Sequence, residues 1–180
     1  NKVQILLSAV DKYSAQQLAS SELLSSNLMY TEDYATLAKQ ALTRDDAIGT
    51  FLNALNRKFA DISVNGKSVE VRIELNNDSQ INFNDEVGTD YDLLADLITD
   101  WMKKNAFKND CHIKSKGDKL IWFDHVKIPI KNEDGTNYYP DDFARTLYKF
   151  LKKLGPQVKT GKMDLDLKPI VGSKIQINIK

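Results

Sequence analysis

The spacing of apolar residues changes near residue 65, from helical intervals to strict alternation. Before this point, apolar residues recur every three to four positions and predict helices that begin at Thr31 and Thr43. From Val3 to Asn27 a partial helical stripe is interrupted by the Ser/Gln-rich residues 14–21, so we expect one long helix or two broken helices there. The first third of the chain is therefore predicted to be helical.

After residue 65 the pattern favours strands. Asn65-Gly66 is typical of a type I′ hairpin turn, and apolar residues alternate with charged ones from Val69 to Leu75. Amphipathic helices are predicted to begin at Thr89 and at Pro140. Further alternating runs predict strands at residues 111–115, 119–123, 126–130, 163–167 and 175–179.

These elements predict an α+β fold in which a helical N-terminal third precedes a mostly antiparallel sheet with two helices. Residues 69–123 and 126–179 share the order strand, polar turn, helix and two strands, which favours a duplicated βαββ unit. We expect a helical region at 1–60 and a sheet region at 61–180, packed as one globular unit. Two small domains are the alternative.

Charge is unevenly distributed along a chain whose net charge is zero. Residues 1–102 carry 8 Lys and Arg against 16 Asp and Glu, whereas residues 103–180 carry 17 against 9. An acidic half and a basic half predict an anionic partner for the basic half, or docking of the two halves on each other within one chain or between copies.

The strongest candidate site is a basic stripe on the helix that begins at Pro140. Arg145, Lys149, Lys152 and Lys153 are spaced to lie opposite the apolar residues of that helix. Cations that neutralise phosphates and aromatic rings that stack on bases would together bind nucleic acid. Further candidate contacts are Lys159, Lys162, Lys114, Lys116 and Lys119, with Trp122 and Tyr138 as stacking residues. A solvated helix face with the aromatic rings in the core would also explain these residues.

The sequence contains little that indicates catalysis. It lacks a phosphate-binding loop and a dinucleotide fingerprint, so we expect no nucleotide cofactor. Cys111 could form a site with Asp124 and His125, but structural zinc sites usually contain paired cysteines, and this chain has one. We therefore predict neither a metal site nor a catalytic residue.

The same single cysteine favours a reducing compartment, and we expect the cytoplasm or the interior of a host cell. No apolar run approaches the roughly 18 residues of a membrane-spanning helix, so no membrane partner is predicted. The residues show no secretory signal pattern.

Two functions remain open at this level. The first is a non-enzymatic protein whose basic C-terminal half contacts nucleic-acid phosphates. The alternative is an assembly or adaptor protein that uses complementary acidic and basic surfaces for a protein partner or for self-association. A thiol enzyme that uses Cys111 and His125 is a weaker third hypothesis.

Overall fold

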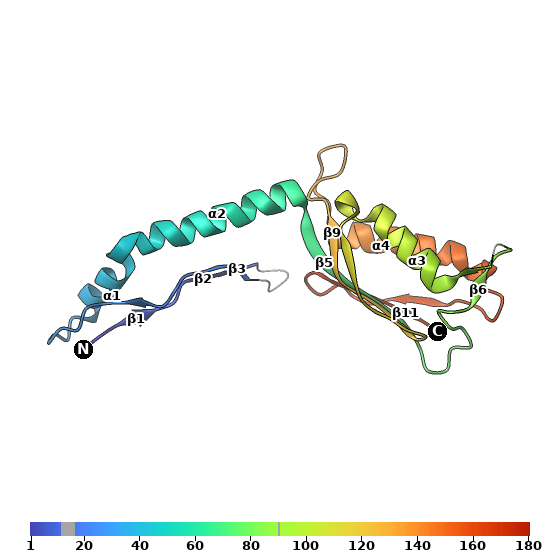
Figure 1. Ribbon diagram of the computed structural model, residues 1–180, viewed down its shortest axis with the longest axis horizontal. Helices are drawn as coiled ribbons and strands as arrows, with labels where there is room; N and C mark the ends of the chain where they lie inside the picture. The colour runs from blue at the N-terminus through green and yellow to red at the C-terminus, as the bar shows by residue number, and fades with distance from the viewer. Residues whose placement is uncertain (12–16, 90) are drawn as a thin grey trace. The chain divides into compact units, whose positions relative to one another are not determined.

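The computed structural model describes residues 1–11, 17–89 and 91–180 (Figure 1). The chain divides into two compact units, unit 1 (Asn1–Val64) and unit 2 (Asn65–Lys180). Helices and strands are mixed, and the strands pair mostly antiparallel. The predicted α+β class is confirmed.

Unit 1 begins with strands where a helix was expected. The strands are β1 (Gln4–Ile5), β2 (Ser8–Val10), β3 (Gln17–Ser20) and β4 (Leu24–Ser25). β1 pairs antiparallel with β4, and β2 pairs antiparallel with β3. The helix predicted over residues 3–27 is therefore wrong for the described residues, and its portion at 12–16 lies outside them.

Serine side chains explain part of this difference. The Ser26 hydroxyl accepts a hydrogen bond from the Val3 N–H at 3.0 Å, and the Ser21 hydroxyl accepts one from the Leu7 N–H at 2.9 Å. Serine competes with helical hydrogen bonding by binding nearby backbone groups in other conformations. The apolar residues between Gln4 and Val10 also alternate between half-buried and exposed, which is the periodicity of a strand.

The two helices predicted next are present and are separated by a kink. They are α1 (Tyr34–Thr43) and α2 (Ala47–Asn65), joined by the short 3-10 helix η1 (Arg44–Asp46). α1 is capped by Asp33, whose carboxylate accepts a hydrogen bond from the Thr36 N–H at 3.1 Å. The kink follows from positive φ angles of 51° at Asp45 and 53° at Asp46.

Unit 2 is built on a five-stranded sheet with the order β10-β11-β5-β9-β8. The strands are β5 (Lys67–Leu75), β8 (Cys111–Lys116), β9 (Leu120–Ile128), β10 (Leu165–Leu167) and β11 (Lys174–Ile179). β11 runs parallel to β5, and the other neighbouring pairs are antiparallel. The strand expected at 126–130 begins as the second half of β9. The boundary between the predicted repeats therefore falls inside one strand, and the duplicated βαββ unit stays a prediction.

Two local predictions in unit 2 are wrong. Gly66 does not lie in a hairpin turn: α2 ends at Asn65, β5 begins at Lys67, and Gly66 joins them with a φ of 74°. Thr89 does not cap the next helix, because α3 (Leu94–Asn105) begins five residues later. The short strand β7 (Asp92–Leu93), which pairs antiparallel with β6 (Glu86–Val87), occupies part of this interval.

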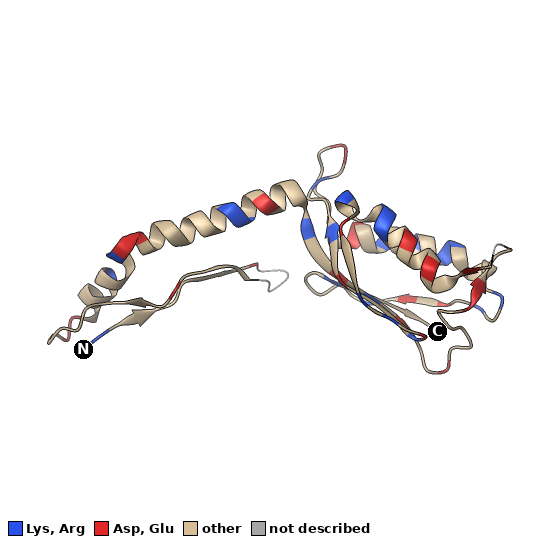
Figure 2. Cartoon of the chain, in the orientation of Figure 1, with Lys and Arg blue, Asp and Glu red and all other residues tan. Residues whose placement is uncertain are grey.

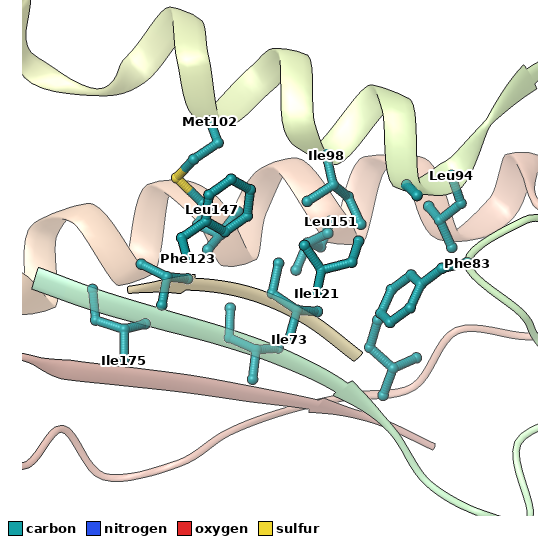
Figure 3. Packing of buried hydrophobic residues seen from close by; sticks show 14 of the residues in the cluster. Ile73, Phe83, Leu94, Ile98, Met102, Ile121, Phe123, Leu147, Leu151 and Ile175 are labelled. Carbon is teal, nitrogen blue, oxygen red and sulfur yellow. The ribbon is translucent and has the colours of Figure 1, made fainter. Parts of the chain in front are cut away.

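The helices α3 and α4 (Pro140–Leu154) cover one face of the sheet (Figure 1). The core lies between them and the sheet, where Ile73 and Phe123 meet Ile98 and Leu147 (Figure 3). All four side chains are fully buried. Short 3-10 helices follow each helix, η2 (Phe107–Asn109) after α3 and η3 (Gly155–Gln157) after α4. No helix of unit 2 in the described chain lies on the other face of the sheet, which we call the open face.

Candidate nucleic-acid interface

Helix α4 presents the predicted basic stripe. Pro140 occupies its first turn, and the carboxylate of Asp142 accepts a hydrogen bond from the Tyr139 N–H at 2.9 Å, which fixes the start of the helix. The helix buries five residues against the sheet: Phe143, Ala144, Leu147, Leu151 and Leu154. Because a helix repeats every 3.6 residues, the opposite side carries Arg145, Lys149, Lys152 and Lys153, and all four are exposed. We call these four residues the α4 stripe.

The described part of the chain does not neutralise the cations of the α4 stripe. Within the described residues, none of the four forms an ion pair or a side-chain hydrogen bond. From Arg145 to Lys153 the stripe extends about 12 Å along the helix axis, at about 1.5 Å per residue. The charged residues of the helix layer are coloured in Figure 2. The stripe is therefore a solvent-facing row of positive charge, and Lys162 is exposed a short distance further along the chain.

Three other predicted contact residues are engaged within unit 2. The ammonium group of Lys159 lies 2.8 Å from the Glu86 carboxylate and 4.7 Å from the centre of the Tyr91 ring. Lys116 forms an ion pair with Asp96 of α3. Lys119 donates hydrogen bonds to the carbonyl oxygens of Ser79 and Ile81, at 2.9 and 3.1 Å. These lysines hold parts of unit 2 together.

Trp122 lies on the open face of the sheet, away from α4. Its neighbours Ile121 and Phe123 point into the core (Figure 3), and side chains alternate between faces along a strand. A cation from each neighbouring strand lies over the Trp122 ring. The distances to the ring centre are 4.9 Å from Arg72 Cζ and 3.9 Å from Lys114 Nζ. The structure therefore does not bring Trp122 and Lys114 together with the α4 stripe.

Tyr138 lies just before α4 and is half-buried. Burial raises the pKa of the Tyr138 hydroxyl, the Asp142 carboxylate adds to the rise, and a hydrogen bond with Thr146 opposes it. The carbonyl oxygen of Tyr138 accepts a hydrogen bond from Lys67 at 2.9 Å. Tyr138 is thus held beside α4 by packing and hydrogen bonds, close to one end of the stripe.

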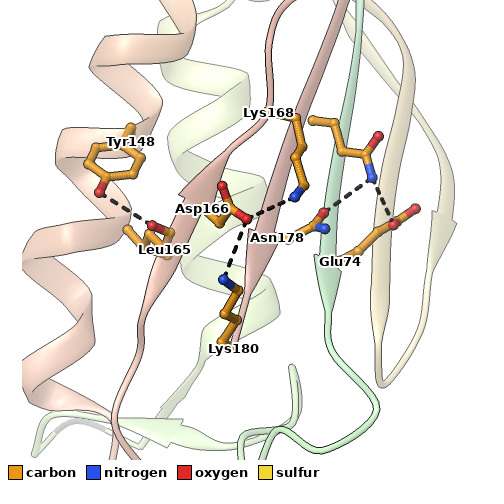
Figure 4. A network of polar contacts seen from close by, with 8 residues as sticks. Glu74, Tyr148, Leu165, Asp166, Lys168, Asn178 and Lys180 are labelled. Carbon is orange, nitrogen blue, oxygen red and sulfur yellow. Dashed lines mark hydrogen bonds and ion pairs between the residues drawn. The ribbon is translucent and has the colours of Figure 1, made fainter.

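A polar network on the open face was missed by the sequence reasoning (Figure 4). The Asp166 carboxylate accepts a hydrogen bond from Lys168 at 2.8 Å and lies 3.6 Å from the Lys180 ammonium group. Gln176 donates hydrogen bonds to Glu74 at 3.1 Å and to Asn178 at 3.2 Å. The polar positions of the alternating runs were the available signal, but they do not show which strands are neighbours.

The residues around Cys111 form separate pairs. His112 Nδ1 lies 2.8 Å from Asp124 Oδ1, whereas His125 Nε2 lies 3.4 Å from Asp110 Oδ1. Cys111 is opposite Val126, and not opposite Asp124 as a regular hairpin would place it. Burial raises the pKa of the Cys111 thiol, so the reactive thiolate is disfavoured. In the part of the chain that the structure describes, no three His, Cys, Asp or Glu residues are grouped for a metal ion.

The fold and the stripe define an α+β protein with a helix-covered sheet and a cationic helix surface. A family model described as a domain of unknown function (DUF6175) matches residues 67–177, which is more than half of the chain. The chain belongs to this family. The matched segment runs from the first residue of β5 into β11 and includes all of α4.

No curated protein and no solved structure matches the chain. Among the described residues, no helix has both the length and the apolar character needed to cross a membrane.

Proposed function

We propose that this protein is a non-enzymatic nucleic-acid-binding protein whose α4 stripe contacts phosphates. The observation that carries the proposal is that Arg145, Lys149, Lys152 and Lys153 are exposed and have no acidic partner in the described chain. A nucleic-acid backbone would meet four cations on one helix face. No ion pair among the described residues would have to be broken for binding.

The physical basis is the release of counterions from the nucleic-acid backbone. Each lysine or arginine that neutralises a phosphate displaces condensed cations, and this supplies most of the free energy of sequence-independent binding. Lys116 and Lys159 contribute less, because each already faces a carboxylate of unit 2. Trp122 is a poor stacking partner while Arg72 and Lys114 contact its ring. Phosphate contacts carry no sequence information, so we expect little preference between base sequences.

Charge reversal within the α4 stripe tests this proposal. The triple variant Lys149→Glu, Lys152→Glu, Lys153→Glu should weaken binding to a labelled oligonucleotide by at least about 100-fold, as expected when several phosphate contacts become repulsive. Fluorescence anisotropy measures the dissociation constant, and circular dichroism checks that α4 is intact. The exposed face tolerates charged side chains, so folding should be preserved.

The control makes the same change in net charge elsewhere. It replaces Lys39, Arg57 and Lys131, which are also exposed, with glutamate. This variant should lose much less affinity than the stripe variant. Equal losses in the two variants, or unchanged binding by the stripe variant, would remove the α4 stripe from the proposal.

We assign the protein to a reducing compartment, either the cytoplasm or the interior of a host cell. The support is Cys111, a free and partly buried thiol in a chain without a second cysteine.

A second candidate function is protein assembly, and the observation that favours it lies in unit 1. Of the 14 exposed large apolar residues in the described chain, 11 belong to unit 1, among them Leu28 at 76% and Tyr30 at 106% exposure. Exposed apolar residues that form a contiguous patch are typical of surfaces that bind other proteins. The acidic and basic halves are partly paired inside unit 2, so apolar contact is the better basis for assembly.

Light scattering at low and high salt distinguishes assembly through apolar surface from assembly through complementary charges. Association through apolar surface should persist at high salt, whereas association through complementary charges should be lost.

A further inference from the structure

Helix α2 carries an apolar face that the described residues of unit 1 leave largely exposed. Ile48, Leu52, Leu55 and Phe59 follow one another at intervals of four, three and four residues, the spacing of the core positions in a coiled coil. We call these four residues the α2 seam. Ile48 is 42% exposed, Leu52 and Phe59 are each 49% exposed, Leu55 is half-buried, and α2 contains no fully buried residue.

The rest of unit 1 faces a different side of α2. A groove of about 440 Å³ separates α2 from the β3–β4 segment, and the α2 residues that line it are Ala47, Thr50, Phe51 and Ala54. At 100° per residue, these positions are rotated from the α2 seam by roughly a third of a turn. The intrachain contact therefore does not occupy the seam.

We propose that the α2 seam packs against the same seam of a second copy of this chain, with the two helices antiparallel. In that orientation the intervals match around a two-fold axis: Ile48 opposes Phe59 of the second copy, and Leu52 opposes its Leu55. Each layer then repeats by symmetry, so the seam is complementary to itself, as a two-fold interface requires. Antiparallel pairing also sets the large Phe59 against Ile48 and opposes the two helix dipoles favourably.

The charges beside the seam are compatible with a second copy. The six flanking positions are Gly49, Phe51, Asn56, Lys58, Ser63 and Asn65. Lys58 is the only charged residue among them, and its ammonium group lies 3.8 Å from Asp61 of the same helix. Two seams can therefore meet without opposing like charges, and the contact should be insensitive to salt.

The area of the seam indicates how tight this dimer is. From Ile48 to Phe59 the helix advances only about 17 Å, so the pair alone buries less than the roughly 1,600 Å² of a standard stable interface. Exposed apolar residues elsewhere in unit 1, such as Leu6 and Leu23, offer further area. We therefore expect a dimer that dissociates on dilution.

Sedimentation velocity on the full chain, from micromolar to near-millimolar concentration in high salt, tests the proposal. The wild-type chain should shift from monomer to dimer with concentration, and Leu52→Glu should stay monomeric throughout. Asn53→Glu adds the same charge on the far side of α2 and should dimerise like the wild type. A wild-type chain that is monomeric at every concentration, or a Leu52→Glu variant that dimerises normally, would overturn the proposal.

Disulfide formation tests the orientation without relying on a destabilised variant. In a Cys111→Ser background, a mixture of Leu52→Cys and Leu55→Cys chains should form mainly the mixed disulfide. Preferential coupling of each variant with itself would contradict the antiparallel arrangement. Loss of nucleic-acid binding in the α4 stripe variant should leave both results unchanged, because the two surfaces lie in different units.

Discussion

Lysines in the same basic half of this chain have different roles because their partners differ. Lys159 and Lys116 reach acidic residues of the earlier half, Glu86 and Asp96. Lys149 and Lys152 face solvent on α4 and have no such partner within the described residues. The positions of these four lysines in the sequence do not distinguish the paired ones from the exposed ones. Which lysines are free to bind phosphate is determined by the tertiary structure.

Asp166 should make stability depend on pH. Its hydrogen bond from Lys168 lowers the pKa of the carboxyl, burial raises it, and the charges of Lys168 and Lys180 lower it further, so that the net change in pKa is downward. A lowered pKa in the folded state stabilises the fold at neutral pH, and this contribution is lost as the pH falls below about 4. In Asp166→Asn, the free energy of unfolding should therefore fall less between about pH 6 and about pH 3 than in the wild type.

Urea unfolding at the two pH values measures this difference. Asp164→Asn is the control, because it removes an exposed carboxylate two residues away. An Asp166→Asn variant with the same pH dependence as the wild type would show that this network contributes nothing to folding.

At the scale of elements, the spacing of apolar residues predicted the helices of several turns and the strands of several alternating residues. α4 and its basic stripe followed from periodicity alone, because both faces of a helix are determined by residues three and four apart. The N-terminal strands could not be predicted from periodicity, because the apolar spacing from Val3 to Val10 fits a helix as well as a strand. Serine hydrogen bonds beside the strands favour the extended conformation, and these depend on residues about 14 to 23 positions apart.

The open face shows why the candidate site was only partly predictable. The sequence predicts Trp122 beside the basic helix because both belong to the same half of the chain. Its face of the sheet depends on register, and the register of β8 against β9 shifts between Ile113 and Ser115. Such shifts reverse which side chains share a face, and the sequence does not mark them.

Substitution by alanine should destabilise the fold more at Gly66 than at Gly135, although both glycines have a left-handed backbone conformation. Gly66 has a φ of 74°, and an added Cβ there would overlap the carbonyl oxygen of Ile128 and press on the Phe107 ring. Gly135 has a φ of 83° with nothing within 4 Å of an added Cβ. We expect Gly135→Ala to cost about 1 kcal/mol and Gly66→Ala about 2 kcal/mol or more. Denaturant unfolding of both variants measures the costs, and equal costs would mean that the tight contact with β9 is absent.

At the scale of the whole molecule, the charge division lies inside unit 2 and not between the units. Unit 1 carries 6 Lys and Arg against 7 Asp and Glu, and unit 2 carries 19 against 18. Each unit is thus nearly neutral, and much of the charge in unit 2 is paired internally. The surfaces left for partners are different in kind: the cationic α4 stripe in unit 2 and the apolar α2 seam in unit 1.

The α4 stripe is proposed to bind nucleic-acid phosphates, and the salt dependence of wild-type binding tests this most directly. Fluorescence anisotropy with a labelled duplex, repeated over a salt series, gives the slope of the logarithm of the binding constant against the logarithm of salt concentration. Three or four phosphate contacts predict a slope of about −3 to −4. Absence of binding at low salt, or a slope near zero, would contradict the account.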